Sequence, residues 1–370
     1  MNVKTAVVGC GGISEIYLTN MINTYHTLDV VCCADLNLDA ARARAEQFGI
    51  RACTYDEILA DESISIVVIL TPAPSHYTLA KQALETGKHV YIEKPLTLDL
   101  EEGKALIKLA HAQGLLLGAA PETFMGSCFQ TARKALDDGL IGEITGFSIS
   151  ANRDTDLTAA LFPFIRKSGG DICADYGVYY LTALFSLLGP AERVFAYTSK
   201  RKVERVNPFP GHPEEGKQYL YDNESQVNAV LRLRNGITGN LALNGDSNFQ
   251  DLGLFHIYGT KGILCLGDAN QFGASVSVVP NDYSVLTNWR VIGGQSLTPV
   301  SGVQLNCRGI GPSEMGWALL HHESSIVDAQ LSYHVLETIE AIKTSGRTAQ
   351  EIPIISTCET PRAFAEWENI

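Results

Sequence analysis

Apolar runs and amphipathic segments alternate along roughly the first third of the chain. The runs are short and lack polar alternation, which is typical of strands buried on both faces of a parallel sheet. The segments between them carry apolar side chains at helical spacing and end at glycines. We expect strands at residues 4–8, 28–34, 64–70, 89–92 and 115–119, with helices from residue 13 and at 38–48, 76–85 and 99–112. The alternation predicts a doubly wound parallel sheet.

The pattern changes near Ala120-Pro121. Residues 227–233 and 237–243 alternate apolar and polar positions around Asn235-Gly236, which predicts an antiparallel hairpin with a type I′ turn. A long helix from residue 325 to 343, ended by Gly346, is expected to close this part, which we predict to be mostly an antiparallel sheet with helices on one face.

We therefore expect an α/β protein of two domains. Residues 1–121 form the domain with the doubly wound parallel sheet, and residues 122–370 form an α+β domain with the mostly antiparallel sheet. The length of 370 residues is sufficient for both.

The turn Gly9-Cys10-Gly11-Gly12-Ile13-Ser14 lies between the first strand and the first helix. Gly9 allows a tight turn, Gly11 lets the backbone approach a pyrophosphate, and the helix N-terminus offers N–H groups to that anion. Ser14 stands where a third glycine is expected, and a small residue still permits close helix packing. Gly9, Gly11, Gly12 and Ile13 are therefore the expected cofactor contacts.

Asp35 follows the second strand, at the distance expected for a carboxylate that binds the adenosine ribose. It would repel a ribose phosphate, which favours NAD over NADP. Arg42 and Arg44 lie one helix away and keep NADP open as the alternative.

Glu93-Lys94-Pro95 follows the strand at residues 89–92. A lysine at the carboxyl end of a parallel strand faces the crevice in which such folds bind ligands, so Lys94 is a candidate for proton transfer beside the nicotinamide. Taken alone, the tripeptide favours an ordinary exposed lysine before a proline. Together with the glycine-rich turn and the second constellation described next, it favours a chemical role for Lys94.

A second candidate constellation contains Asp175 and Tyr179. The two residues are four apart at the start of an expected helix over residues 175–188, so their side chains project from one face. Spacing alone leaves open whether Asp175 only complements the helix dipole and Tyr179 only packs.

These motifs together resemble the glucose-fructose oxidoreductase, inositol dehydrogenase and rhizopine-catabolism family, called Gfo/Idh/MocA. The resemblance spans nearly the whole chain and is carried, in order, by Gly9-x-Gly11, Thr71-Pro72-x-x-x-His76, Glu93-Lys94-Pro95 and Gly169-Gly170-x-x-x-x-Asp175-x-Gly177-x-Tyr179. It implies that residues 1–121 are a Rossmann domain that binds NAD and that residues 122–370 serve substrate binding and oligomerisation, the latter often through an open sheet. It also implies a pyranose, polyol or related alcohol or ketone as substrate.

The resemblance also implies roles for single residues. Lys94, Asp175 and Tyr179 match the catalytic positions, with tyrosine in place of the commoner histidine. Four residues are expected to line the cofactor: Thr71, Pro72, His76 and Glu93. For His76 the alternative is an ordinary residue in the first turn of a helix. For Glu93 the alternative is a residue that anchors the loop. Glu122 is expected to reach the substrate. The chain departs from the family pattern at two positions, with Ser168 in place of a glycine and Asp171 in place of a small apolar residue. Both departures are expected to affect the wall of the substrate pocket.

Three functions are compatible with these residues. The first is an NAD-dependent oxidoreductase acting on a secondary alcohol or ketone of a sugar, glycoside or cyclic polyol. The second is a glycoside-cleaving enzyme that oxidises the sugar transiently and keeps its NAD bound. The third, a cofactor-sensing regulator, is disfavoured because a sensor does not need both Lys94 and Tyr179.

Composition and charge indicate which classes of binding partner and which compartment are expected. The net charge of −13, without a basic run, disfavours nucleic acid. Apolar runs are strand-sized, so no membrane span is expected, and nine scattered cysteines are typical of a reducing compartment. We expect a cytoplasmic homodimer or homotetramer. The adjacent residues His321-His322-Glu323 are unlike a metal site, because neighbours in the chain rarely converge on one ion without a further ligand at defined spacing. No metal is therefore expected.

Overall fold

The computed structural model describes residues 2–167, 169–201, 203–247, 253–281, 294–301 and 306–365. Its contacts separate two compact units. The first comprises Met1–Gly126, Gln304–Leu336 and Pro361–Ile370, and the second comprises Ser127–Val303 and Glu337–Thr360. Our division between residues 121 and 122 remains a prediction about domains; the compact units differ from it because two late segments belong to the first unit.

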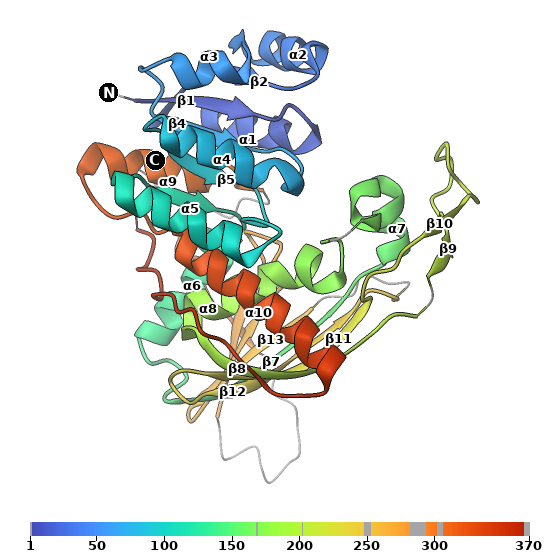
Figure 1. Ribbon diagram of the computed structural model, residues 1–370. Helices are drawn as coiled ribbons and strands as arrows, with labels where there is room; N and C mark the ends of the chain where they lie inside the picture. Colours follow the sequence, from blue (N-terminus) through green and yellow to red (C-terminus); the bar gives the residue numbers. More distant parts are fainter. Residues whose placement is uncertain are drawn as a thin grey trace. The chain divides into compact units, whose positions relative to one another are not determined.

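The first unit contains a six-stranded sheet in which every pairing is parallel, in the order β3-β2-β1-β4-β5-β6 (Figure 1). The strands are β1 (Val3–Val8), β2 (Leu28–Ala34), β3 (Arg51–Ala52), β4 (Ile66–Ile69), β5 (His89–Ile92) and β6 (Leu117–Ala119). The helices are α1 (Gly12–Asn23), α2 (Leu38–Phe48), α3 (Tyr55–Ala60), α4 (His76–Glu85), α5 (Leu100–Gln113) and α9 (Ile310–His321). The predicted doubly wound fold is confirmed, and among its strands only the two-residue β3 was not expected.

Helix ends in this unit follow from their cap residues. Asn37 caps α2 by accepting from the backbone of Asp39 and Ala40, and Gly49 ends the helix in the left-handed region, at φ 67°. Asp99 and Gly114 do the same for α5. Side-chain oxygens before a helix and a glycine after it satisfy the free backbone groups at each end.

A C-terminal segment completes the first unit. Asn20 on α1 donates to the carbonyls of Asn306 and Arg308, and Thr27 donates to the carbonyl of Ser313 on α9. Gly118 on β6 has no room for a side chain, because an added Cβ would lie 2.6 Å from the carbonyl oxygen of Val327. Residues more than two hundred positions later in the chain thus cover this side of the sheet.

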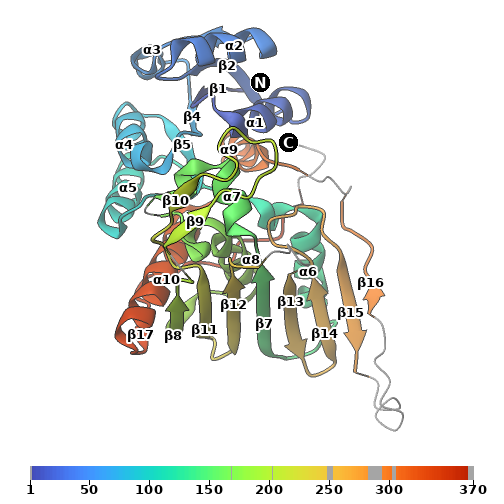
Figure 2. The ribbon, with the colours of Figure 1, turned by 90° about the vertical axis from the view of Figure 1, so that its right-hand side faces the viewer.

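The second unit contains a nine-stranded mixed sheet, mostly antiparallel, in the order β16-β15-β14-β13-β7-β12-β11-β8-β17, whose strands run side by side in Figure 2. The strands are β7 (Ile144–Asn152), β8 (Ala191–Ser199), β11 (Gln226–Leu233), β12 (Thr238–Asn244), β13 (Leu254–Gly259), β14 (Gly262–Leu266), β15 (Val276–Pro280), β16 (Gln295–Ser296) and β17 (Ile352–Pro353). A separate hairpin joins β9 (Glu204–Val206) and β10 (Gln218–Leu220).

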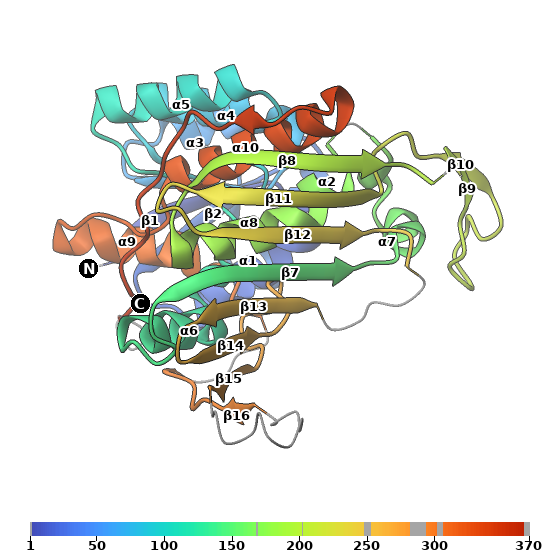
Figure 3. The ribbon, with the colours of Figure 1, turned by 90° about the horizontal axis from the view of Figure 1, so that it is seen from below.

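Buried and exposed residues alternate strictly along β11, so one face of this sheet is covered and the other is open. Figure 3 shows α6 (Ser127–Asp137) and α8 (Val178–Leu188) behind the sheet. The unit also contains the short α7 (Thr155–Leu161), and α10 (Ala329–Thr348) begins in the first unit and continues into this one. The predicted antiparallel sheet with helices on one face is confirmed.

Two local predictions were wrong. The hairpin between β11 and β12 is present, but its turn is not type I′, because that turn needs positive φ at both central residues and only Gly236 has it, at 88°. A hydrogen bond from Gly236 N to Leu233 O closes a four-residue turn instead. Gly346 does not end α10, which continues to Thr348. This glycine is needed for packing, since an added Cβ would lie 2.3 Å from Thr198 Oγ1.

Candidate active site

The glycine-rich turn has the geometry of a phosphate cradle. Gly9 has φ +103°, and a Cβ there would lie 2.7 Å from the backbone of Leu70, so both conformation and space require glycine. An added Cβ at Gly11 or Gly12 would meet no atom within 4 Å among the described residues. No side chain caps α1 there, so its first N–H groups face this open space. The turn therefore fits a pyrophosphate.

Asp35 braces this turn. Its carboxylate accepts hydrogen bonds from Cys10 N and from Asn37 N, both at 2.8 Å. Arg44 is paired with Glu15 at 3.1 Å, and Arg42 lies exposed beside Asp39. Both arginines are thus already neutralised by carboxylates, and Asp35 remains the charge at the end of β2, which favours an adenosine with a free ribose hydroxyl.

Ser14 and Ile13 occupy the first turn of α1. The Ser14 hydroxyl donates to the carbonyl of Gly11 at 2.6 Å, and the side chain is fully buried. A residue as small as serine thus replaces the expected third glycine without opening the packing. Ile13 is 36% exposed beside the turn.

His76 connects two loops at the carboxyl ends of β4 and β5. Its ring is buried, with Nε2 2.8 Å from the carbonyl oxygen of Thr71 and Nδ1 2.7 Å from that of Pro95. Burial lowers the pKa of His76, and the two carbonyl contacts oppose this shift. A neutral imidazole donates through one nitrogen only. These contacts are those of a loop clamp, and the expected cofactor contact of His76 remains a prediction.

Glu93 positions the backbone of Lys94. One carboxylate oxygen accepts from Lys94 N at 2.7 Å, and the other accepts from the hydroxyl of Tyr17 at 3.2 Å. Because β1, β4 and β5 are neighbours, Lys94 lies at the same sheet edge as the glycine-rich turn and the Thr71-Pro72 loop.

Glu122 is buried below this edge, with 2% of its surface exposed. One of its oxygens accepts from Tyr17 at 3.2 Å and from the hydroxyl of Tyr91, and the other accepts from Gly309 N at 3.0 Å. Burial raises the pKa of Glu122 and that of Tyr17. The substrate contact expected from sequence is untested, but these bonds are those of an internal hub that ties the C-terminal segment to the sheet.

Asp175 and Tyr179 lie in the second unit on a continuous helical stretch. Asp175 belongs to a π-helical segment, η4 (Cys173–Gly177), which passes into α8 one residue before Tyr179. Such π turns occur frequently at functional sites. The expected helix over residues 175–188 is present with this altered first turn. Tyr179 is nearly buried, whereas the hydroxyl of its neighbour Tyr180 donates to Asp268 at 3.0 Å.

Arg153, which our sequence reasoning did not consider, contacts the candidate residue Asp175. It follows β7 directly, and its Nη1 lies 3.0 Å from Asp175 Oδ2. Its guanidinium also lies over the ring of Tyr176, 4.7 Å from the centroid, and Nε donates to Thr158 Oγ1 at 3.2 Å. An arginine after a strand gives no sequence signal by itself. Only the fold shows that it meets a carboxylate 22 positions away.

Asp171 caps the π-helical segment, and its expected effect on the pocket wall remains a prediction. Its Oδ1 accepts from Cys173 N and Ala174 N, and its Oδ2 faces Lys343 Nζ at 3.4 Å. Burial raises the pKa of Asp171, and the ammonium of Lys343 opposes this shift. The departure at Ser168 lies outside the described residues.

Two further sequence features have structural explanations. His321 stacks on Trp317 and lies 2.8 Å from its carbonyl oxygen. Among the described residues, no three His, Cys, Asp or Glu side chains gather as ligands for a metal ion. Likewise, no helix in this part of the chain has the length and apolar character needed to cross a membrane.

Comparisons with known proteins agree with this geometry. Residues 3–120 match the family model "Oxidoreductase family, NAD-binding Rossmann fold" of Gfo/Idh/MocA, and residues 129–265 match the model of the Gfo/Idh/MocA C-terminal domain. The chain is 35% identical over 154 residues to the uncharacterized oxidoreductase YhhX of Escherichia coli, which is 41% of this chain and 43% of that protein. The match therefore spans less than half of YhhX.

A longer match is to scyllo-inositol 2-dehydrogenase (NAD(+)) of Bacillus subtilis, 27% identical over 294 residues, 75% of this chain and 80% of that protein. Among solved structures, levoglucosan dehydrogenase in complex with NADH and L-sorbose has a TM-score of 0.81 and 20% identity, covering 96% of this chain and 99% of that one. At this identity the likeness establishes the fold.

Proposed function

Since the chain belongs to the Gfo/Idh/MocA oxidoreductase family, with an NAD-binding Rossmann domain, we propose that it transfers a hydride between NAD and a secondary alcohol or ketone of a sugar, glycoside or cyclic polyol. The observation that carries the proposal is the single sheet edge in the first unit. There the open glycine-rich turn, the Thr71-Pro72 loop and Lys94 follow three neighbouring strands. A relative that acts on scyllo-inositol supports a polyol or sugar as substrate.

The chain supplies the groups that such a reaction needs. NAD, when bound, accepts the hydride. Gly11 and Gly12 leave room for its pyrophosphate, and Asp35 stands where a ribose hydroxyl can donate to it. Lys94 takes the hydroxyl proton of the substrate as general base, and returns it in the reductive direction.

The second unit contributes Tyr179 and Asp175 to the proposed mechanism. Tyr179 shares the proton with Lys94, and Asp175 orients substrate hydroxyls. A fixed orientation raises the rate because the reacting groups no longer have to find each other in solution.

A direct experiment separates the proposed function from its alternative. Purified protein is first tested for bound NAD, then given NAD with scyllo-inositol, levoglucosan, free sugars and aryl glycosides. Sustained formation of NADH from a sugar or polyol supports the dehydrogenase. Release of the aglycone without net NADH would indicate glycoside cleavage instead, and no reaction with any compound would contradict both.

We also propose that the protein is a cytoplasmic homodimer or homotetramer that associates through the open face of the nine-stranded sheet. Support comes from apolar side chains on this face: Tyr197 on β8 is 65% exposed and Val230 on β11 is 57% exposed. Light scattering on the wild-type protein and on the Val230→Asp variant tests this, since a charge at an apolar interface should shift the mass toward the monomer.

A further inference from the structure

We propose that Arg153 and Asp175 form a subsite for two neighbouring hydroxyl groups of a neutral substrate, with Arg153 donating to one oxygen and Asp175 accepting from the other. The inference rests on the proposed function, because it specifies the polyol that the enzyme takes. It requires a guanidinium that is held rigidly, that has donors to spare, and whose charge is already balanced.

Three contacts hold the guanidinium of Arg153. The carboxylate of Asp175 lies at its edge, the ring of Tyr176 covers one of its faces, and the hydroxyl of Thr158 accepts from Nε. The backbone is fixed as well, because Arg153 N donates to Asn244 O at 2.8 Å. Only 17% of the side-chain surface is exposed, so little conformational freedom remains to be lost when a ligand binds.

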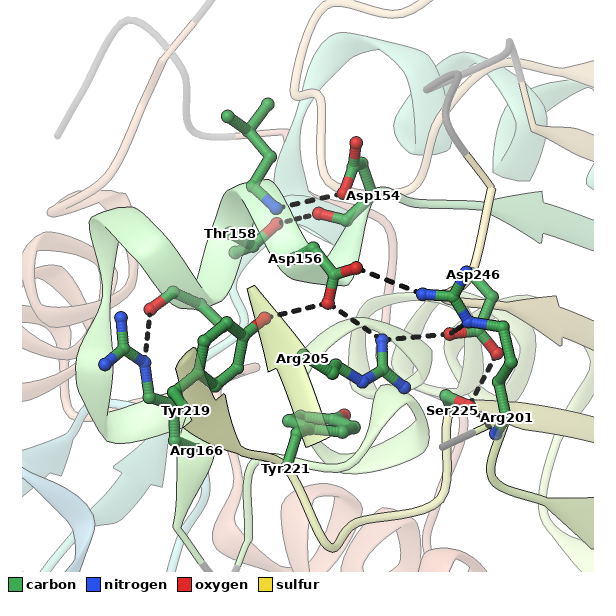
Figure 4. A network of polar contacts seen from close by, with 12 residues as sticks. Asp154, Asp156, Thr158, Arg166, Arg201, Arg205, Tyr219, Tyr221, Ser225 and Asp246 are labelled. Atoms are coloured by element: carbon green, nitrogen blue, oxygen red, sulfur yellow. Dashed lines mark hydrogen bonds and ion pairs between the residues drawn. The ribbon is translucent and has the colours of Figure 1, made fainter. Parts of the chain in front are cut away.

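The third contact is itself anchored. Thr158 donates to the carbonyl of Asp154, whose side chain caps α7 (Figure 4). The next carboxylate, Asp156, pairs with Arg201 at 3.1 Å and with the buried Arg205 at 3.0 Å, and Arg205 pairs in turn with Asp246 (Figure 4). This alternating network fixes the start of α7 and therefore the position of the Thr158 hydroxyl.

Donors remain on Arg153 for a ligand. A guanidinium carries five N–H groups, and the contacts to Asp175 and Thr158 use two of them. Within the described residues, no further hydrogen bond of this guanidinium is present. A donor and an acceptor side by side match adjacent hydroxyls, because each hydroxyl can both donate and accept.

Charge decides the class of substrate. The positive charge of the guanidinium and the negative charge of the carboxylate lie 3.0 Å apart and balance each other. The pair as a whole therefore has little attraction for a phosphate, a carboxylate or an amine. An anionic sugar would also meet Asp175 as a like charge. A neutral vicinal diol satisfies both partners without adding a charge to a site in which each side chain is nearly buried.

The test is a binding measurement on the NADH complex, using quenching of NADH fluorescence. The first probe is scyllo-inositol, whose hydroxyls are all equatorial and all have neighbours, so that any orientation presents a vicinal pair. The matched probe is cis,cis-cyclohexane-1,3,5-triol, which has equatorial hydroxyls but no vicinal pair. We expect wild-type protein to bind scyllo-inositol more tightly by about tenfold or more.

Substitution of Arg153 should remove this preference. Arg153→Met should lower the affinity for scyllo-inositol by about tenfold, while it changes the affinity for the triol by about twofold at most. Arg153→Lys keeps a cation beside Asp175 and thus protects folding, but it lacks the planar fork and should lose most of the preference too. The matched control is Arg166→Met, since Arg166 also pairs with a carboxylate, Glu214, and lies over a tyrosine ring, Tyr219. It should change neither affinity.

Equal weakening of both probes by the Arg153 variants would overturn the inference, as would a wild-type protein that binds scyllo-inositol no better than the triol or not at all. These outcomes are separate from those of the proposed function. Formation of NADH from a sugar, with unchanged diol preference in Arg153→Met, leaves the dehydrogenase standing and removes the subsite. If the Arg153 variants lose the preference for scyllo-inositol but the protein never forms NADH from any compound, the subsite stands and the dehydrogenase is contradicted.

Discussion

Glu93 and Lys94 have different roles although they are adjacent. The carboxylate of Glu93 is used by Lys94 N and by Tyr17, so it fixes the backbone from which the lysine side chain extends. Lys94 thus lies two residues after the end of β5, with its backbone N–H held by Glu93. If Lys94 is the general base that we propose, its fixed backbone reduces the entropy that is lost on the way to the transition state.

Replacement of Lys94 should therefore affect chemistry more than binding. We expect Lys94→Ala to lower kcat by about a hundredfold or more, as loss of a general acid or base does, and to change the dissociation constant of NAD by a small factor only. Stopped-flow turnover and NADH fluorescence titration measure the two quantities. Unchanged turnover would mean that another group moves the proton.

Tyr179 and Tyr180 provide a matched pair. We expect Tyr179→Phe to lower turnover about tenfold or more, because it removes the hydroxyl that we propose to share the proton with Lys94. Tyr180→Phe should leave turnover unchanged but lower the melting temperature, because it removes a part-buried hydrogen bond to Asp268. Steady-state kinetics and thermal denaturation of both variants distinguish these effects. If the two variants have equal turnover, Tyr179 is a packing residue.

At the scale of elements, His76 is the joint between two loops of the proposed site. It lies at the first position of α4 and contacts the carbonyls of the loops that follow β4 and β5. Two loops of the proposed cofactor site are thereby held by one titratable ring.

This joint predicts a pH dependence of stability. Because burial places the pKa of His76 below its usual value of about 6.5, only the unfolded chain takes up the proton as pH falls through that value. The contribution of this ring to the free energy of unfolding is thus complete above about pH 6.5. It declines as the pH falls toward the pKa of the folded state, by about 1.4 kcal/mol for each unit by which the pKa values of the folded and unfolded states differ. Urea unfolding at about pH 7.5 and about pH 5.5 should show a larger loss for wild type than for His76→Gln, which does not titrate. Parallel losses would contradict this assignment.

The elements also show what sequence could predict. Strands such as β2 and β5, and helices such as α2 and α4, agree with the expected limits because apolar runs and cap residues are local signals. The π turn at η4 was not predictable, since no local pattern distinguishes it from an α-helical start. Arg153 was missed for a related reason: its importance arises from a contact across the fold, and the same is true of the Glu122 hub.

At the scale of the whole molecule, the first unit is built from distant segments. The backbone N–H of Gly309 reaches the buried carboxylate of Glu122, and the carbonyls of Cys307 and Ser313 accept from Tyr25 and Thr27. Hydrophobic periodicity identified the strands of this unit, but it does not say onto which sheet a later helix packs. For this reason the return of α9 was absent from the sequence prediction.

The return of α9 predicts the behaviour of fragments. A fragment of residues 1–126 would leave Glu122, Tyr25 and Thr27 without the partners named above, and each unsatisfied buried group costs about 1–3 kcal/mol. Since domains are stable by only about 5–15 kcal/mol, we expect this fragment to show no cooperative thermal transition and no NAD binding. Joining residues 304–336 to it through a flexible Gly/Ser linker should restore both. Circular dichroism melting and NADH fluorescence measure the outcome, and a fragment that folds and binds NAD without residues 304–336 would show that α9 is dispensable to the cofactor domain.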